Sequence, residues 1–437
     1  MFKSYVELLR LPGASAAAVP AALARLATTM IPLALLLTLV QSGRSLAVGG
    51  SAGAAYAVGS AVGGPVIGRL MDRIGPSRVL LVTGPAAGLV LVVTALRAGG
   101  ASTGAVLAAA GAAGLTTAPV GASMRALWTG LTEDPGLRQR AYSFEATLSE
   151  LLFILGPTAV TVLGTVLGAR GALLATAALL GAGGLGYGQA TAVRKHGPRP
   201  RSGAARTEQT RDRAGARRTA ASAMLAAIAL TAALSSGLVV AVTASLQDQG
   251  SAPELAGTLV ALQSVGSVVG GLIYGARTFG GTTYHRYLRL LVVLVLALAV
   301  LPVTRLAYDA GLPAAWALVL LGALLVLSGL PIAPAGAEEF QLVGEMAAQD
   351  KATQAFAGVG SVIAIGGAAG SAVTGLVADH LGSAAALCLP AVFTLAALLV
   401  SLAARKPIIR AVAAPEVEHT EPPASTSPAP NKGEPHS

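Results

Sequence analysis

The sequence predicts an all-α polytopic membrane protein, with twelve transmembrane helices arranged as two parallel six-helix repeats. Its 437 residues are 54% hydrophobic and only 11% charged, and the mean hydropathy is +0.69. Apolar runs of about 20 residues, the length that spans a bilayer, fill most of the chain. A glycine-rich phrase that occurs twice predicts the repeat. Aromatic residues make up only 4% of the chain, whereas a membrane β-barrel needs aromatic girdles.

Counting apolar runs gives twelve candidate spans. They are residues 17–41, 47–70, 77–97, 102–126, 142–167, 169–192, 220–246, 254–277, 287–306, 313–334, 354–378 and 382–404. We therefore divide the chain into an N-terminal segment (1–16), a six-helix bundle (17–192), a basic linker (193–219), a second six-helix bundle (220–404) and a tail (405–437).

The basic residues predict the orientation in the membrane. With the N-terminus inside, only Arg44, Arg97, Arg170 and Arg305 lie outside, and the other 26 of the 30 Lys and Arg lie on or near the cytoplasmic side. The positive-inside rule then predicts cytoplasmic termini in a multi-pass protein of the plasma membrane.

The composition of the basic linker indicates a solvated connector or, alternatively, a contact for anionic lipid or a partner. The Pro- and Ser-rich tail is expected to be disordered.

Two phrases recur in the same order in both halves. VGSAVGGPVIG (58–68) returns as VGSVVGGLIYG (265–275), and GLTTAPVGA (114–122) returns as GLPIAPAGA (329–337). The offsets are 207 and 215 residues. Since six spans return the chain to its starting side, the repeats are parallel. Glycines four residues apart let helices approach closely, which suits either static packing or the rocking of one half against the other.

GRLMDRIGPSR, residues 68–78, resembles the signature between helices two and three of the major facilitator superfamily, in the twelve-helix type found in bacteria. The matching residues are Gly68, Leu70, Asp72, Arg73, Gly75 and Arg78, and the sequence departs from the pattern at Pro76 and Ser77. The resemblance implies a secondary transporter that works by alternating access. It also implies that Asp72, Arg73 and Arg78 latch the halves together on the cytoplasmic side.

The chemistry of the motif supports such a gate. The short turn needs the conformational freedom of glycine at Gly75. The Asp72 carboxylate can cap the donor-rich N-terminus of a neighbouring helix, and the two arginines can pair with acids. In the second half Phe279 stands at the place of Asp72, so the latch is expected to be one-sided. Charges that only set the topology are the alternative.

Two acids in the fifth span are candidates for proton coupling. Glu145 lies one turn from the cytoplasmic end and is expected to pair with Arg125 or Arg138. Glu150 lies about 12 Å in from the cytoplasmic end of the span, at 1.5 Å per residue. A carboxyl there could bind and release a proton as the cavity alternates. A carboxylate held permanently in a hydrogen-bond network is the alternative.

Four further residues are candidates for the gate or the cavity. Glu338 and Glu339, at the inner end of the tenth span, could form an ion pair with Arg125 that closes the two halves, or could be solvated loop acids. Tyr56 and Gln263 occupy equivalent positions in the two repeats. They are candidate substrate contacts, unless they only bridge helices.

The leading function is proton-coupled export of a small amphipathic or drug-like compound. Uptake of a polar metabolite such as a sugar, and a non-transporting receptor or scaffold on the same fold, are the alternatives.

The sequence has no Walker motif, its single Cys388 lies in an apolar run, and its five histidines are scattered, so we expect no enzyme, cofactor or metal site. The net charge of +10 lies in loops, which indicates no nucleic acid partner. The expected partners are the small-molecule substrate, protons and the lipid bilayer, around a monomer.

Overall fold

The computed structural model describes residues 7–195, 197, 208–252, 255–277 and 279–413. In that part of the chain eleven helices are long and apolar enough to cross a membrane. The longest, α7 (Pro135–Gln189), has 55 residues and breaks at Gly168, where φ is 73° and ψ is 164°. At 1.5 Å per residue its two segments together contain about 80 Å of helix, more than twice the hydrocarbon thickness. It therefore supplies two passes, and the prediction of an all-α polytopic membrane protein is confirmed.

The helices fall into two sets along the chain. The N-terminal half consists of α2 (Ala14–Gln41), α3 (Leu46–Ile74), α4 (Pro76–Arg97), α5 (Thr103–Thr116), α6 (Val120–Leu131), α7 and α8 (Thr191–Lys195). The C-terminal half consists of α9 (Glu208–Asp248), α10 (Leu255–Gly275), α11 (Thr283–Ala299), α12 (Val303–Asp309), α13 (Ala314–Gly329), α14 (Ile332–Met346), the 3₁₀ turn η1 (Gln349–Lys351), α15 (Ala352–Leu381), α16 (Ser383–Ala403) and α17 (Arg405–Val412).

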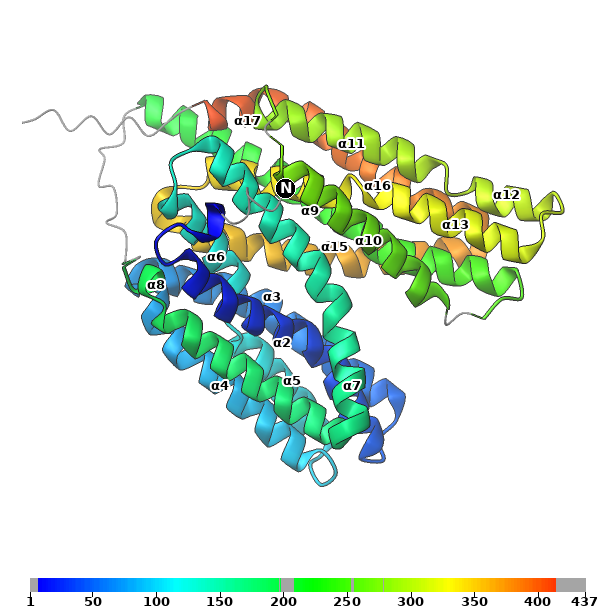
Figure 1. Cartoon of the computed structure of the whole chain (residues 1–437), viewed down its shortest axis with the longest axis horizontal. Helices are drawn as coiled ribbons and strands as arrows, with labels where there is room; N and C mark the ends of the chain where they lie inside the picture. The colour runs from blue at the N-terminus through cyan, green and yellow to red at the C-terminus, as the bar shows by residue number, and fades with distance from the viewer. Residues whose placement is uncertain (1–6, 196, 198–207, 253–254, 278, 414–437) are drawn as a thin grey trace, which may run out of the picture.

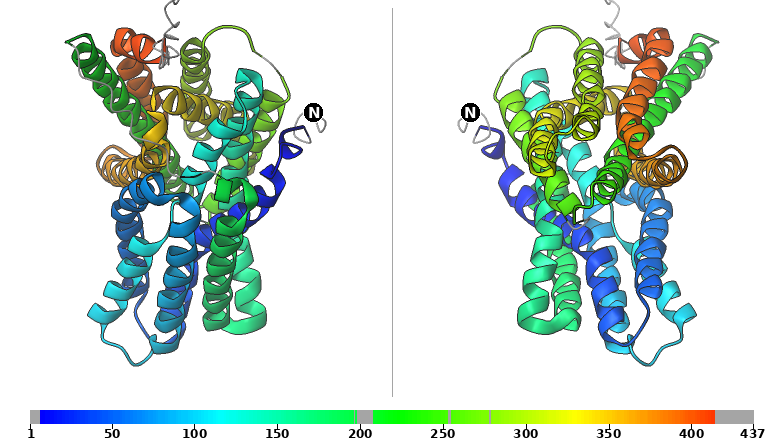
Figure 2. Two further views of the ribbon diagram at one scale, coloured as in Figure 1. Left: turned by 90° about the vertical axis from the view of Figure 1, so that its left-hand side faces the viewer. Right: turned by 90° about the vertical axis from the view of Figure 1, so that its right-hand side faces the viewer.

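The two halves meet at one end and diverge toward the other, as the long helices in Figure 1 show. The end views in Figure 2 separate the blue-to-green N-terminal half from the green-to-red C-terminal half. We call the end that carries the α3–α4 turn and η1 the closed end. Between the halves, α3 packs on α15, and α7 packs on α10 and α14.

The second repeated phrase marks a break in the fourth span of each half. In GLTTAPVGA, α5 ends at Thr116 and α6 begins at Val120. In GLPIAPAGA, α13 ends at Gly329 and α14 begins at Ile332. Both breaks contain a proline, which has no N–H to donate to the helix ladder. With the offset of 215 residues, the break at 117–119 corresponds to 332–334, so the break at 330–331 falls in the same phrase but just before the equivalent place.

The first repeated phrase packs on the second, in the same way in each half. A Cβ built at Gly59 would collide with the carbonyl oxygen of Gly111, and a Cβ at Gly63 with that of Leu115. In the other half the same holds for Gly266 with Val326 and for Gly270 with Leu330. Each pair keeps the offsets of 207 and 215 residues, so these glycines hold α3 on α5 and α10 on α13 inside each half.

Two segments have more helix than the sequence suggested. The end of the basic linker, residues 208–218, is the first part of α9, because this stretch contains no proline and only one glycine. Residues 405–412, expected to be disordered, form α17, which packs on α9 with Ile408 and Ala411 buried. The rest of the predicted linker and tail lies largely outside the described residues.

Replacing Gly270 by alanine should lower the thermal stability of the detergent-solubilised protein, because the new Cβ meets a backbone carbonyl that cannot rotate away. Overpacking of this kind costs about 1–3 kcal/mol. Gly64→Ala in α3 is the matched control, since a Cβ there has no heavy atom within 4 Å and alanine stabilises a helix interior. Equal melting temperatures for the two variants would contradict the packing described here.

Candidate functional site

The α3–α4 turn joins the two halves at the closed end. Asp72 accepts hydrogen bonds from the backbone N–H groups of Thr353 (3.1 Å) and Gln354 (2.9 Å) in the first turn of α15. These N–H groups have no partner within their own helix, and a carboxylate is favoured at the positive end of the helix dipole. One turn earlier, Gly68 lies against Ala357, Gln354 and Thr353, where a side chain would be crowded. The Asp72 carboxylate therefore caps a helix of the opposite half.

The turn itself consists of Gly75 alone, which has φ 93° and is followed by Pro76 as the first residue of α4. Only glycine adopts this conformation without strain. Ser77 donates a hydrogen bond to the carbonyl oxygen of Gly188 (2.7 Å) and so ties the turn to the end of α7. Arg73 and Arg78 are both exposed.

The equivalent turn of the second half is built differently. Phe279, at the place of Asp72, stacks its ring on Tyr274 at 4.4 Å within the same half. The helix-capping contact of Asp72 thus has no counterpart at Phe279, as the sequence predicted.

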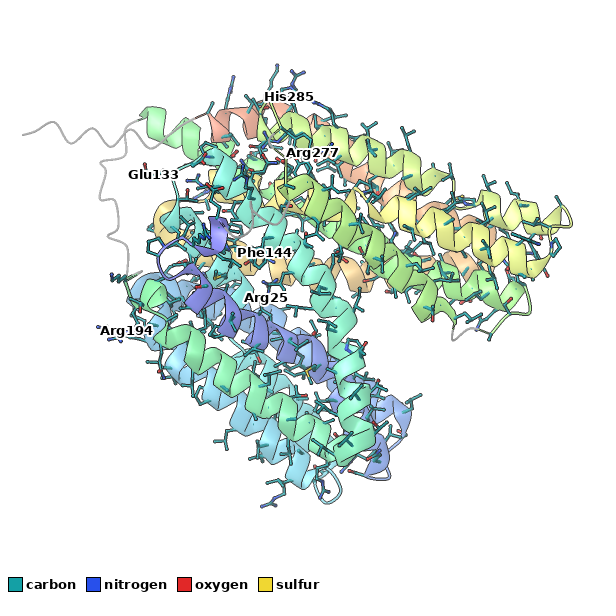
Figure 3. The ribbon with its side chains drawn as sticks, in the orientation of Figure 1. Arg25, Glu133, Phe144, Arg194, Arg277 and His285 are labelled. Atoms are coloured by element: carbon teal, nitrogen blue, oxygen red, sulfur yellow. The ribbon has the colours of Figure 1, made fainter. Side chains whose placement is uncertain are left out.

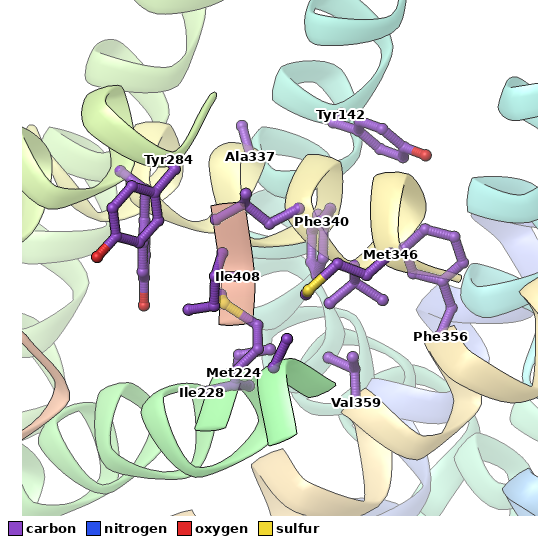
Figure 4. Packing of buried hydrophobic residues seen from close by; sticks show 14 of the residues in the cluster. Tyr142, Met224, Ile228, Tyr284, Ala337, Phe340, Met346, Phe356, Val359 and Ile408 are labelled. Carbon is purple, nitrogen blue, oxygen red and sulfur yellow. The ribbon is translucent and has the colours of Figure 1, made fainter. Parts of the chain in front are cut away.

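We call the contact region between the two halves at the closed end the joint. An apolar core crosses it beside the α3–α4 turn. The buried residues Ala122, Ala126, Tyr142 and Ala146 of the N-terminal half belong to one cluster with α9, α11, α14, α15 and α17 of the other. Figure 4 shows its central side chains, with Tyr142 near Met346 and Phe356; the rings of Tyr142 and Phe356 are 6.0 Å apart. Apolar burial and the Asp72 cap therefore close the same end of the molecule.

Arg125 crosses the joint, but not through the predicted ion pair. Its guanidinium lies 3.8 Å from the centre of the Phe340 ring on α14, a cation–π geometry. Residues 125 and 340 differ by the repeat offset of 215, so equivalent positions of the two halves stack on each other. The hypothesis of a bridge from Arg125 to Glu338 or Glu339 is corrected by this contact, because both acids point to partners in their own half.

Glu338 forms an ion pair with Arg286 of α11, at 2.8 Å from Oε1 to Nε and 3.1 Å from Oε2 to Nη2, and it also accepts a hydrogen bond from the Tyr274 hydroxyl. Its side chain is 0% exposed. Glu339 accepts hydrogen bonds from the hydroxyls of Thr231 (3.1 Å) and Tyr287 (3.2 Å). Neither acid is a solvated loop residue.

Glu145 is also paired within its half, and with a different arginine from those expected. Its Oε2 lies 2.7 Å from Nη1 of Arg25 in α2, and its Oε1 accepts from the indole N–H of Trp128 at 3.1 Å. Arg25 also donates to Ser149. Arg25 lies between the ribbons of the N-terminal half in Figure 3, and Glu145 is 1% exposed. This buried, fully occupied pair takes the place of the expected partners Arg125 and Arg138.

Glu150 lies on the seam where α7 faces α10 of the other half. Ser143 donates a hydrogen bond to the carbonyl oxygen of Gly271 (2.8 Å), and Thr147 fills the space beside the same glycine. One turn further along, the Glu150 carboxyl lies next to the side chain of Ser264. No ion pair to Glu150 occurs among the described residues, so its only identified polar partner is a hydroxyl of the opposite half.

Tyr56 and Gln263 bridge helices within their own halves. The Tyr56 hydroxyl lies 3.5 Å from Thr117, and the Gln263 amide donates to Ser328 at 3.2 Å. Both side chains are 5% exposed, which makes them packing residues rather than cavity surface in this conformation.

Sequence reasoning missed two residues that organise the site, Arg25 and Arg286. Both are arginines near the end of an apolar run, where the sequence predicts only topology-setting charges. Their acidic partners lie 120 and 52 residues away along the chain. Glu145 lies inside a predicted span, where it needs a counter-charge, whereas Glu338 lies beyond the end of the predicted tenth span. No group of three or more His, Cys, Asp or Glu able to hold a metal lies among the residues that the structure describes.

The structure is a membrane-spanning bundle of two helical halves that meet at one end. The model of the Major Facilitator Superfamily matches residues 18–336. The chain belongs to this superfamily, and the predicted family and fold are confirmed.

Solved structures share the fold. The human organic anion transporter MFSD10 (TETRAN) superposes with a TM-score of 0.67 at 19% identity, covering 89% of this chain and 98% of that one. A bacterial homologue of the iron transporter ferroportin in its outward-facing state gives 0.69 at 15%, covering 90% and 99%; the same homologue with soaked iron gives 0.64 at 15%, covering 92% and 99%. A comparison with curated protein sequences found no match.

Removing one partner of the Arg25–Glu145 pair should destabilise the protein more than removing both. Glu145→Gln leaves a buried guanidinium without its counter-charge, which in protein interiors costs about 3–5 kcal/mol. The double variant Arg25→Met with Glu145→Gln removes both charges and should recover much of the lost melting temperature in detergent. A double variant that melts as low as the sum of the two single changes would show that charge compensation is not the main contribution.

Asp72→Asn should loosen the closed end while leaving the fold intact. The amide keeps an acceptor but loses the charge at the helix N-terminus, about 0.3–2 kcal/mol, or roughly a two- to thirty-fold change in the opening equilibrium. The measurement is the maleimide labelling rate of Ala357→Cys, a buried position at the joint, in a Cys388→Ser background. Asp309→Asn, which removes a half-exposed charge far from the joint, is the control, and unchanged labelling in Asp72→Asn would contradict a gating role.

Proposed function

We propose that this chain is a proton-coupled exporter of small amphipathic compounds, with Glu150 as the coupling residue. A carboxyl in the membrane without a cationic partner is costly to keep charged, so it tends to bind a proton when it is shielded from water. Glu150 meets that condition on the seam between the halves. Glu145 and Glu338 do not, because each holds a buried arginine. Glu145 is therefore the weaker of the two predicted coupling candidates.

The seam position is the observation that carries this proposal. Ser264, the partner of Glu150, belongs to the opposite half, so the polar environment of Glu150 must change when the halves move apart. A proton-coupled transporter needs a titratable group whose surroundings differ between its two states. Glu150 binds its proton in one state and releases it in the other.

The proposed orientation places the closed end, with both termini, in the cytoplasm of a cell bounded by the plasma membrane. The distribution of Lys and Arg supports it. In that orientation the structure is the outward-open state of a monomer, and Asp72 with Arg73 and Arg78 is the cytoplasmic gate. The likeness to an outward-facing structure of the same fold is consistent with this state.

The apolar character of the spans supports an amphipathic substrate. Beside Glu150, α7 exposes Leu151 and Phe153, the latter by 66%. A solute with apolar surface can replace water against such side chains.

An organic anion is a second candidate for the substrate. Arg125 is a half-buried guanidinium whose Nε has no hydrogen-bond partner among the described residues. It lies on the joint against an aromatic ring instead of an acid. A carboxylate or sulfonate could pair with it as the halves move. Competition of anionic against neutral dyes for export would favour one class over the other.

Cells that lack their main exporters and express this protein should accumulate less of a transported dye, and a protonophore should abolish the difference. Glu150→Gln should reduce gradient-dependent export by at least tenfold, because the amide cannot exchange a proton. Glu7→Gln, at an exposed acid whose side chain is 63% accessible, is the control and should transport normally. Export that survives in Glu150→Gln and still collapses with the protonophore would assign coupling to another residue.

A further inference from the structure

A polar pocket separate from the Glu150 seam lies between the halves at the closed end. Its volume is about 1,030 Å³, the size of a site for a small organic ligand. The α6–α7 connection forms its wall from the N-terminal half. The wall from the other half consists of residues 279–283, the end of α14, Arg217 of α9 and Val412 of α17. A ligand here would contact both halves.

Unpartnered donors gather on one part of the pocket wall. The Nε atoms of Arg138 and Arg217 and the amide nitrogen of Gln139 are buried and have no hydrogen-bond partner among the described residues. Gln139 is 5% exposed, so water does not readily compensate it. Buried polar groups are normally satisfied, and these three donors lack a partner that a ligand in the pocket could supply. Arg138 also donates through Nη2 to the carbonyl oxygen of Thr132 (3.0 Å). Two guanidiniums and an amide are donors suited to an oxyanion.

An unpartnered acceptor lies in the same pocket. Glu345 is held in place because its Oε1 accepts hydrogen bonds from Thr283 (2.8 Å) and Gln341 (2.9 Å), whereas its Oε2 and the Oε1 of Gln341 have no partner among the described residues. A carboxylate oxygen repels a fully deprotonated oxyanion and accepts a hydrogen bond only from a ligand that carries a proton. Of the other charged side chains on the wall, Arg286 is neutralised by Glu338, and Glu133 adds a second acid.

We propose that this pocket binds a phosphate group that carries a proton, either inorganic phosphate or the monoanionic form of a phosphate monoester. The second pKa of a phosphate monoester is about 6. Such a group offers oxygens to Arg138, Arg217 and Gln139, and a P–OH donor to Glu345. Sulfate has the same shape but no proton near neutral pH, so Glu345 discriminates against it. The pocket volume leaves room for an organic group attached to the phosphate.

Binding stabilises the conformation in which the closed end is shut. The donors Arg138 and Gln139 belong to one half, while Arg217 and Glu345 belong to the other, so a bound phosphate connects them. A ligand shifts an equilibrium toward the state that it binds more tightly. The site is thus a regulatory one that slows the transport cycle, and it is independent of the transported solute and of the coupling ion.

The test is the melting temperature of the purified full-length protein in detergent, measured with inorganic phosphate or with sulfate at matched ionic strength. Phosphate should raise the melting temperature in a saturable, concentration-dependent way, and sulfate should be at least tenfold weaker. Arg138→Gln combined with Arg217→Gln should abolish the effect. Arg194→Gln, an exposed arginine of α8 outside the pocket (Figure 3), should leave the effect unchanged.

Glu345→Gln gives a readout that a general loss of stability would not produce. The amide can donate a hydrogen bond where the carboxylate could only accept one, so sulfate should now bind about as well as phosphate. Glucose 6-phosphate in solution and phosphatidic acid in nanodiscs test whether a free monoester or a lipid headgroup binds more tightly than inorganic phosphate. Equal effects of phosphate and sulfate on the wild-type protein, or an unchanged preference in Glu345→Gln, would overturn the proposal.

Discussion

The close approach of two glycines to two backbone carbonyls, repeated at equivalent positions of the two halves, is the constraint on which the rest of the structure depends. Gly59 and Gly63 hold α3 on α5, and Gly266 and Gly270 hold α10 on α13. Backbone in direct contact cannot repack as side chains can, so each half is stiff along this line. The contacts between the halves, in contrast, are made largely by side chains such as Arg125 and Ser143. Relative movement is therefore easiest between the halves.

The buried charges follow the same division. Arg25 with Glu145 and Arg286 with Glu338 each lie within one half, so a rigid-body movement of the halves leaves both pairs intact. The desolvation of these four groups is thus common to every state and does not oppose the movement. Glu150 differs because its hydroxyl partner lies across the seam. This difference is why the proposed coupling role falls on Glu150.

The sequence was sufficient for features that depend on local pattern, such as the spans, the repeat, the glycine turn and the contact of Asp72 with a helix N-terminus. It was not sufficient to pair Glu145 with Arg25 or to place Phe340 on Arg125. Successive residues of a helix point about 100° apart, so the neighbours Glu338, Glu339 and Phe340 face three different directions. Only the packed bundle decides which of them reaches the joint. Likewise the sequence did not predict α17, because this short helix is stabilised by packing on α9, which is distant in the sequence.

The polar contacts between the two halves at the closed end are individually weak. The contacts identified there are a carboxylate on a helix N-terminus, a cation–π stack, a hydroxyl-to-carbonyl hydrogen bond and an apolar cluster. The first two are each worth about 0.3–2 kcal/mol, whereas breaking a buried ion pair costs about 3–5 kcal/mol. One pH unit acting on one proton supplies about 1.4 kcal/mol. A single proton therefore supplies free energy of the same size as one of these polar contacts, and a ligand bridging Arg138 and Glu345 would add a further contact that favours the closed state.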